Sequence, residues 1–199
     1  MADPKEELLA GDDFEDVTFR DLDLGGLNLV DKNFRECRFE QVRFAEARLS
    51  GCTFEDCDVE DCDLTMAKVG GVAFRGVAFR RSKLMGVDWT DVRGISFLVS
   101  FEGCNLSHCT FADRKMPKTV FRECRGHEVS FSAVDLTKCV FTGTDLRGAR
   151  FIDTVLVEAD LSGAVNYDIS PQQNRLRKTK FSQEAALALV AQLGVVVPK

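Results

Sequence analysis

Cysteines and carboxylates crowd together in one stretch of the chain, where they could form a metal site. The residues concerned are Cys52, Glu55, Asp56, Cys57, Asp58, Cys62 and Asp63. Structural zinc sites favour ligand pairs separated by two to four residues, with a second such pair elsewhere. The cysteines of this stretch recur every five residues instead. We therefore interpret them as small apolar core residues and expect no bound metal.

The two histidines, His108 and His127, are the remaining side chains suited to acid–base chemistry at neutral pH. No Ser-His-Asp order, glycine-rich phosphate loop or paired metal motif accompanies them in the sequence. The carboxylates recur along the chain and do not surround a single pocket. The sequence therefore indicates a protein that is not an enzyme and that needs no cofactor.

The residues that could do chemistry share a period of five. Every fifth residue from Phe14 to Trp89 is large and apolar, which gives sixteen consecutive positions. The phase then slips by two residues and resumes from Phe101 to Leu161, where only Gly126 departs among thirteen positions. A helix repeats every 3.6 residues and a strand every two, so neither accounts for the pattern.

A second lane of mostly small residues lies two positions before each large apolar residue. All eight cysteines of the protein fall in this lane. One large and one small inward side chain in each group of five describe a short strand followed by a corner. Units of this kind cannot bury their apolar side alone and must be stabilised by neighbouring units, as in other solenoids.

The five-residue units resemble those of the pentapeptide-repeat family, whose consensus is A-(D/N)-L-x-x. Residues 144–148 (TDLRG) and 159–163 (ADLSG) match it closely. The resemblance covers residues 12–163 and implies an all-β fold, the right-handed, quadrilateral parallel β-helix. Four sides then form a coil of twenty residues, and successive coils pair as parallel strands ~4.8 Å apart.

Stacking places lane residues that are twenty positions apart one above the other. Cys37 and Cys57 form such a pair, and a Cβ separation of about 4.8 Å slightly exceeds the range of a disulfide, so we expect reduced thiols. Lys32 and Arg114 also occupy the small inward lane. Since burial of an unpaired charge is costly, we expect these two units to bulge or turn outward.

The net charge of −6 is spread unevenly. Residues 1–91 hold 21 acidic and 12 basic side chains, residues 92–163 hold nine of each, and residues 164–199 hold two acidic and five basic ones. Four coils span roughly 20 Å, over which duplex DNA carries about twelve charges. The excess of nine negative charges in the first half is comparable, so this surface could imitate DNA. The alternative is a solvated face that only aids solubility.

The outward carboxylates of the first half gather on two neighbouring sides of the expected coil. The predicted partner-binding acidic face consists of Asp13, Glu15, Asp16, Glu36, Glu55, Asp56, Asp58, Glu60 and Asp61. The phenylalanines point inward in the same arrangement, so we interpret them as core residues and not as stacking platforms for single-stranded nucleic acid. These features favour a protein partner over direct binding of nucleic acid.

The phase slip requires a loop or bulge near residues 92–100, because two extra residues cannot remain in a regular main-chain ladder. We expect this segment to project from the rod. Its predicted partner-binding residues are Arg93, Ile95, Phe97 and Leu98.

The pattern changes after Leu161, and residues 164–199 are predicted to form a capping and dimerisation tail. Ser170-Pro171 is typical of a helix start. Residues 183–193 predict a helix that begins after Ser182 and ends at Gly194, and residues 195–197 predict a short strand. The last coil of a solenoid needs a cap. The predicted cap and dimer contacts are Leu187, Val190, Leu193, Val195 and Val197.

The tail supports a narrower resemblance. Residues 181–185 (FSQEA) and 193–197 (LGVVV) are similar to the tails of gyrase-protecting pentapeptide-repeat proteins, which include the quinolone-resistance (Qnr) and albicidin-resistance (AlbG) proteins. Residues 164–167 (AVNY) and 86–89 (GVDW) are similar to the latter. The resemblance implies a rod-like homodimer that imitates DNA, binds DNA gyrase or topoisomerase IV, and relieves poisoning of the enzyme.

A second function remains open, that of a non-enzymatic interaction scaffold with an unrelated partner. Residues 1–7 are acidic and polar, so they do not resemble a signal peptide. No apolar run approaches the ~18 residues of a membrane span. We therefore expect a cytoplasmic protein without a membrane partner.

Overall fold

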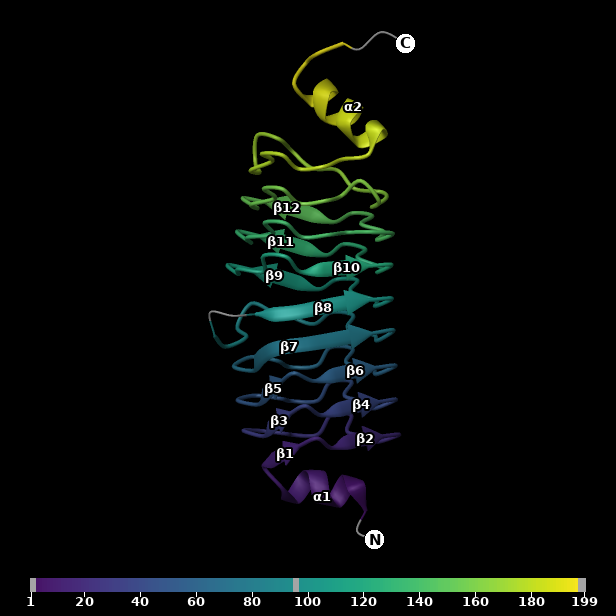
Figure 1. Ribbon diagram of the computed structural model, residues 1–199, viewed down its shortest axis with the longest axis vertical. Coiled ribbons are helices and arrows are strands. Elements are labelled where there is room, and N and C mark those ends of the chain that lie inside the picture. Colours follow the sequence, from purple (N-terminus) through teal and green to yellow (C-terminus); the bar gives the residue numbers. More distant parts are fainter. Residues whose placement is uncertain (1–2, 95–96, 197–199) are drawn as a thin grey trace.

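The protein forms one elongated rod of stacked coils, with both termini at opposite ends (Figure 1). The computed structural model describes residues 3–94 and 97–196. The helices are α1 (Pro4–Ala10) and α2 (Gln183–Gln192), and the strands are β1 (Asp13–Glu15), β2 (Thr18–Arg20), β3 (Asn33–Arg35), β4 (Arg38–Glu40), β5 (Thr53–Glu55), β6 (Asp58–Glu60), β7 (Ala73–Arg80), β8 (Leu98–Glu102), β9 (Thr110–Ala112), β10 (Val120–Arg122), β11 (Ser130–Ser132) and β12 (Arg150–Ile152).

Coils pair in parallel with an offset of twenty residues, which confirms the four-sided β-helix. Phe14 of β1 lies in register with Phe34 of β3, and Phe34 lies in register with Phe54 of β5. Their rings stack with centroid distances of 5.3 and 4.9 Å. Aromatic pairs of this kind add about 0.5–1.5 kcal/mol beyond the burial of their area. The rows of large apolar residues therefore hold each coil on the next.

The corners of the coil require a left-handed backbone conformation. Asp16, Glu36 and Asp56 occupy one corner in successive coils, with φ values of 53°, 53° and 51°, and Gly76 follows with 68°. Aspartate tolerates this conformation better than most residues and glycine adopts it freely. The residue after each strand is therefore a short polar residue or glycine in many units, and its side chain points outward.

The small inward residues have a second role, because they donate hydrogen bonds to the coil below. The Cys57 Sγ lies 3.4 Å from the carbonyl oxygen of Phe34, and the Thr154 Oγ1 lies 3.0 Å from that of Phe131, each 23 residues earlier. The same offset joins Cys37 to Phe14, Cys52 to Leu29, Cys62 to Phe39, Ser82 to Val59, Cys139 to Met116, Thr144 to Phe121, Asn174 to Phe151 and Thr179 to Leu156. The lane therefore selects small donors as well as small volumes.

The prediction that Lys32 turns outward is wrong, because this side chain also donates within the lane. Lys32 is 5% exposed, and its Nζ lies 3.3 Å from the carbonyl oxygen of Leu9, again 23 residues earlier. It also bonds the Gly11 carbonyl oxygen and pairs with Asp12. Helix α1 thus caps the first coil, and the Leu8 side chain of this helix is fully buried. Hydrogen bonds and a carboxylate offset the cost of burying the charge.

The phase slip is a local insertion in the ladder. The Arg93 amide still bonds the Val72 carbonyl oxygen, 21 residues earlier, as in regular coils. After the break Leu98 pairs with Arg75 and Val99 pairs with Val77, offsets of 23 and 22 residues. The insertion therefore lies between Arg93 and Leu98, and a bulge in β7 recovers one residue.

The ladder extends beyond residue 163, where the repeat pattern of the sequence weakens. Val155 bridges to Arg175 and Asp160 bridges to Lys180. Ile169 and Asn174 are buried in the inward lane. The expectation of a helix at Ser170-Pro171 is wrong, because the chain there forms another turn of the coil.

Helix α2 follows Ser182, whose hydroxyl accepts a hydrogen bond from the Ala185 amide at 3.2 Å. This confirms the predicted helix and its N-cap. The strand expected over 195–197 is not observed at Val195 and Val196, and Val197 lies outside the described residues. In the described part of the chain, neither helix has the length and apolar character needed to cross a membrane.

Removal of one inward donor should loosen two adjacent coils. Thr154→Val keeps the volume of the side chain but loses the bond to the Phe131 carbonyl oxygen. We expect a loss of about 1–2 kcal/mol and a fall of a few degrees in the thermal midpoint, measured by circular dichroism. Thr142→Val, at an exposed outward position, should change stability by less than about 0.5 kcal/mol. Equal midpoints for the two variants would contradict a role for the inward donors.

Buried thiols should make the fold sensitive to alkali. Burial raises the pKa of Cys62, Cys109 and Cys139 from 9.0 to about 12. A raised folded pKa stabilises the fold below the unfolded pKa, and this stabilisation is lost as the pH rises towards 12. Each thiol should cost about 1.4 kcal/mol per pH unit above 9.

Urea midpoints at pH 8 and pH 10.5 measure this loss. Cys139→Ser retains a donor of similar size but does not titrate, so its midpoint should fall less between the two pH values. A wild-type midpoint that is the same at both pH values would contradict the raised thiol pKa values.

Candidate partner-binding surfaces

The predicted acidic face is divided between two sides of the rod, and cations of neighbouring coils neutralise part of it. On the side formed by β1, β3, β5 and the start of β7, the Glu15 carboxylate lies 3.2 Å from the Arg35 guanidinium. Asp13 accepts a hydrogen bond of 2.8 Å from the Asn33 amide. Glu55 pairs in register with Arg75 of the next coil. Acidic and basic residues therefore alternate from one strand to the next on this side.

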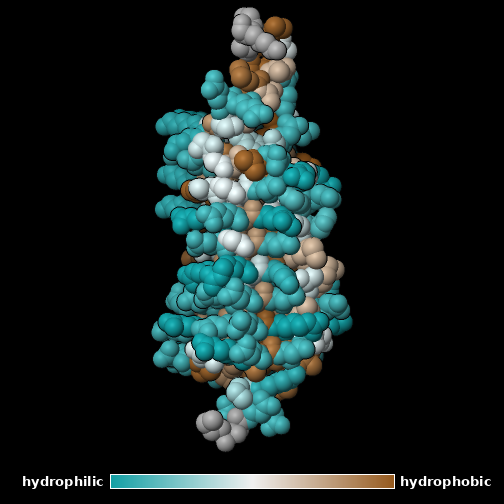
Figure 2. Space-filling model, turned by 90° about the vertical axis from the view of Figure 1, so that its right-hand side faces the viewer, coloured by the Kyte–Doolittle hydropathy of each residue, from teal (hydrophilic) through white to brown (hydrophobic). Residues whose placement is uncertain are grey.

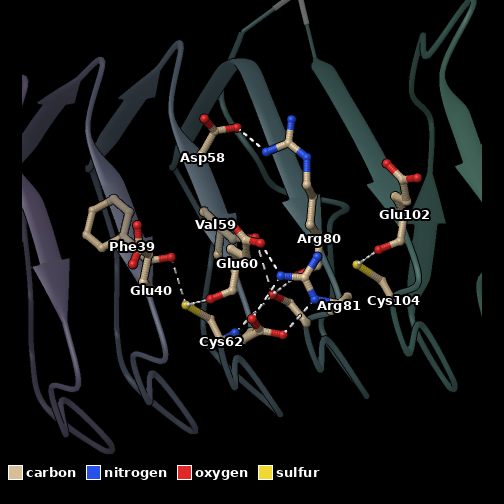
Figure 3. Close-up of polar contacts among 12 residues, drawn as sticks. Phe39, Glu40, Asp58, Val59, Glu60, Cys62, Arg80, Arg81, Glu102 and Cys104 are labelled. Carbon is tan, nitrogen blue, oxygen red and sulfur yellow. Dashed lines mark hydrogen bonds and ion pairs between the residues drawn. The ribbon is translucent and has the colours of Figure 1, made fainter.

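The second side, formed by β2, β4, β6 and the end of β7, is neutralised more completely. Arg81 bonds Asp61 at 2.9 Å and also contacts Glu60, and Arg80 contacts Asp58. Figure 3 shows both arginines extending towards carboxylates of the preceding coil. Hydrogen bonds to Asp61 and then to Glu60 raise the pKa of Arg81. Asp58, Glu60 and Asp61 are therefore weak candidates for a partner contact.

Three carboxylates of the acidic face form a row along one edge of the rod. Asp16, Glu36 and Asp56 are exposed and occupy the same corner in successive coils. Their positions are fixed by the main chain, because the amide of each bonds a carbonyl oxygen of the coil above. None of the three makes an ion pair with another described residue. We call these residues the carboxylate row.

The same side becomes basic beyond the phase break. Lys115, Asp135, Val155 and Arg175 stack on it through successive bridges. Its outward cations in this half are Lys115, Lys118, Lys138, Arg175, Arg177 and Lys178, all exposed. Lys138 pairs with Glu158 at 3.6 Å. The acidic character is therefore confined to the amino-terminal half of the rod.

The described residues of the phase-break loop, 92–94 and 97–98, lie where the acidic half meets the basic half. Figure 1 shows the chain beyond the outline of the neighbouring coils at this level, beside β8. Leu98 is 54% exposed, and Arg93 is exposed while it donates to the Gly51 carbonyl oxygen at 3.3 Å and to the Thr53 Oγ1 at 3.1 Å. These two residues remain candidate contacts.

Two other predicted loop residues do not lie on the described surface. Phe97 is 2% exposed and packs in the core, with its ring 5.5 Å from that of Trp89. It supports the loop from inside and offers no contact to a partner. Ile95 lies outside the described residues.

The tail presents an apolar surface. Leu187 is 46% exposed, Leu193 60% and Val195 53%, while Val190 is half-buried. Val197 lies outside the described residues. In Figure 2 hydrophilic side chains cover most of the visible face of the coils, and apolar residues gather at the tail. Because α2 has no buried residue, its apolar side chains cover the last coil less than the sequence predicts.

The histidines lie on the surface, where each faces a carboxylate. The His127 Nε2 lies 2.9 Å from the Asp145 carboxylate, and the His108 Nδ1 lies 3.6 Å from that of Glu128. Partial burial acts to raise the pKa of Asp145, but hydrogen bonds from Asn166 and His127 hold it at about 2. Residues 3–94 and 97–196 contain no cluster of three or more histidine, cysteine or acidic side chains that could hold a metal ion. The cysteines of the described chain are buried and free.

The fold and its repeat define a solenoid of five-residue units, and family comparisons identify it. The family model described as "Pentapeptide repeat region" matches residues 27–93, and the model described as "Pentapeptide repeats (8 copies)" matches residues 104–143 and 135–165. These matches cover well over half of the chain. The protein belongs to the pentapeptide-repeat family.

Solved structures share this fold at low sequence identity. HetL, a pentapeptide-repeat protein involved in heterocyst differentiation regulation from the cyanobacterium Nostoc sp. strain PCC 7120, is 16% identical, with a TM-score of 0.73 over 89% of this chain and 91% of that one. A trypsin-treated form of QnrB1, a plasmid-mediated fluoroquinolone resistance protein, is 18% identical, with a TM-score of 0.63 over 94% and 100%. No curated protein sequence matches this chain. At these identities the likeness establishes the fold.

Proposed function

We propose that this protein imitates DNA, binds DNA gyrase or topoisomerase IV, and protects the enzyme from a topoisomerase poison. The observation that carries the proposal is the carboxylate row Asp16, Glu36 and Asp56, which is exposed and lacks ion pairs with described residues. The protein would act by binding, without catalysis. The proposal requires a cytoplasmic chain, because the enzyme and its DNA are there.

The spacing of the carboxylate row supports this proposal. Its members are one coil apart, which is ~4.8 Å along the rod. One strand of duplex DNA carries a phosphate every 3.4 Å of helix axis. An enzyme surface that binds DNA carries fixed positive charges, and complementary charges speed encounter and favour the correct partner. The row therefore offers such a surface a charge density close to that of one DNA strand.

Rigidity supports the proposal as well. The corner residues are held by main-chain hydrogen bonds to the next coil, and the rod is filled by stacked aromatic rings. A preorganised surface loses less conformational freedom on binding than a flexible one. The row would thus keep its spacing when an enzyme groove closes on it.

A scaffold function with an unrelated partner is the second candidate. The shared fold of HetL, which is involved in regulation of heterocyst differentiation, supports this second candidate. Both candidates use the same rod, and they differ in the identity of the partner. Affinity capture that retains another protein and no topoisomerase subunit would support the scaffold function.

A supercoiling assay tests the proposed function. Purified protein added to DNA gyrase, relaxed plasmid and a fluoroquinolone or another gyrase poison should restore supercoiling in a concentration-dependent manner. The assay needs several classes of poison, because the proposal does not specify one. An absence of rescue with every class and at every protein ratio, with topoisomerase IV also unprotected, would contradict the proposal.

Neutralisation of the carboxylate row should weaken the rescue. The triple variant Asp16→Asn, Glu36→Gln and Asp56→Asn removes three charges but keeps residues suited to the corners. We expect about a tenfold rise in the concentration for half-maximal rescue, since a few charge contacts of ~0.5 kcal/mol each are lost.

A matched control removes the same charge elsewhere. Asp113→Asn, Glu123→Gln and Asp153→Asn alter exposed residues that also occupy left-handed corners, with φ values of 49°, 52° and 53°. The control should rescue as the wild type does. Equal loss in both triple variants would point to net charge and not to the row.

We further propose that two chains pair through the tail. Leu187, Leu193 and Val195 expose apolar surface there, with Val190 and Val197 as further contacts. Burial of such surface contributes about 25 cal/mol per Å², and a two-fold axis would bring the same patch of both chains together. Sedimentation should give a dimer for the wild type and a monomer for Leu193→Asp, with Leu98→Asp as a control that stays dimeric. A monomeric wild type would contradict this pairing.

A further inference from the structure

Arg114 reaches from the coil above into the chain that leads to the phase-break loop. Its Nε lies 3.0 Å from the Trp89 carbonyl oxygen and its Nη2 lies 2.6 Å from that of Thr90, and Nη2 also contacts the Val92 carbonyl oxygen. The guanidinium lies 5.8 Å above the centre of the Phe97 ring. The expectation that this unit turns outward is therefore wrong. Its side chain points inward, bonds the chain on the amino-terminal side of the insertion and contacts the Phe97 ring on the other side.

This contact is an extended form of the hydrogen bond made throughout the inward lane. Cys104 and Cys109, which precede Arg114 in the lane, donate to Phe79 and Leu84, 25 residues earlier because the coil contains the insertion. Arg114 stands in the same relation to Trp89. A thiol in this position would satisfy one carbonyl oxygen. The guanidinium has five N–H donors in a planar fork, so it also binds the carbonyl oxygens where the chain leaves the ladder.

The loop is held from below as well. The Arg93 amide bonds the Val72 carbonyl oxygen at 2.6 Å, and its side chain reaches the Gly51 carbonyl oxygen and the Thr53 hydroxyl in an earlier coil. Phe97 fills the interior between Phe74 and Trp89, at centroid distances of 6.1 and 5.5 Å. Both ends of the loop are thus anchored, although regular strand pairing stops there.

We propose that Arg114 is the positioning residue of the phase-break loop, and that it holds Arg93 and Leu98 in place for contact with a protein partner. The identity of that partner as a DNA topoisomerase rests on the proposed function. Without the guanidinium, the carbonyl oxygens of Trp89, Thr90 and Val92 at the entry to the loop would lose their hydrogen bonds from Arg114. The chain would then gain freedom that a partner must remove on binding.

Arg114 is half-buried, and a cation at this inward position has an energetic cost. Desolvation lowers the pKa of Arg114, and the nearby Asp91 carboxylate opposes that change. An apolar residue would avoid the cost of desolvation, as valine does elsewhere in the lane. Lys32 is the comparable case, since it binds carbonyl oxygens where the ladder starts. A buried lysine therefore lies where the ladder starts, and a half-buried arginine lies where it is interrupted.

Arg114→Met tests directly whether Arg114 positions the phase-break loop; we call this positioning the clamp. Methionine keeps an apolar stem but donates no hydrogen bond. Lys32→Met is the matched control, which removes the other cation of the inward lane. Limited trypsin digestion measures cleavage after Arg93, and acrylamide quenching of Trp89, the single tryptophan, measures opening of the core beneath the loop. We expect at least about a tenfold faster cleavage at Arg93 and stronger quenching in Arg114→Met. Both should be unchanged in Lys32→Met.

The proposed contact of the loop with a partner is tested by rescue of gyrase from a poison, at a temperature where every variant is folded. Arg114→Met should need about tenfold more protein for half-maximal rescue, whereas Lys32→Met should match the wild type. Arg114→Lys retains the charge but donates from a single nitrogen instead of the planar fork of three, so it should lie between wild type and Arg114→Met in both cleavage and rescue. A purely structural role would leave rescue equal among folded variants.

The outcomes separate this inference from the proposed function. Equal cleavage and quenching in Arg114→Met and wild type would overturn the clamp, and Arg114→Lys provides the same comparison if Arg114→Met does not fold. Faster cleavage with unchanged rescue would overturn the role in partner binding and leave the proposed function intact. A wild-type protein that gives no rescue would overturn the proposed function and the partner contact, while digestion would still decide the clamp.

Discussion

The structure depends on hydrogen bonds from inward side chains to the carbonyl oxygens of the coil below. Water is excluded from the core, so a second lone pair of these oxygens can be satisfied only by a protein donor. Cysteine, serine and threonine supply it in regular coils, as Cys57, Ser82 and Thr154 do. Where the coil is interrupted, Lys32 and Arg114 supply it with longer side chains. These bonds account for the thiols and the two cations in a lane that also contains many valine and alanine residues.

A rigid interior leaves function to the outer surface. The coils fix corner residues at a spacing of ~4.8 Å, so charges there form ordered rows instead of mobile clusters. Most charges on the strand faces are neutralised between neighbouring coils, as Arg80 and Asp58 are. Exposed pairs of this kind contribute little to stability, but they remove those carboxylates from recognition. What remains for a partner is the carboxylate row, the projecting loop beside it, and the apolar tail.

The period of five was sufficient to predict the inward rows and the phase break, because apolar periodicity determines which side chains face the core. The four-sided coil was predicted from the resemblance to the pentapeptide repeat, and helix α2 from Ser182 at its start and Gly194 at its end. It was not sufficient to predict contacts between coils. A count of outward carboxylates in the sequence treats Asp61 and Asp56 alike. In the structure Asp61 pairs with Arg81, whereas Asp56 makes no ion pair with a described residue. Phe97 was assigned to the surface because the break hid its inward phase. A search for hydrogen-bond donors 23 residues after each large apolar residue would have placed Lys32 inward, since it follows Leu9 by 23. Across the insertion the offset is 25, and that offset from Trp89 would have placed Arg114 inward.

The central functional claim is that this protein occupies the site of DNA on a topoisomerase. Competition measures this most directly, by the fluorescence anisotropy of a labelled DNA duplex bound to gyrase as unlabelled protein is added. The account predicts that the duplex is displaced, and that displacement weakens as salt concentration rises because charge drives the contact. A duplex that stays bound at saturating protein, at low salt as well as high, would contradict the account.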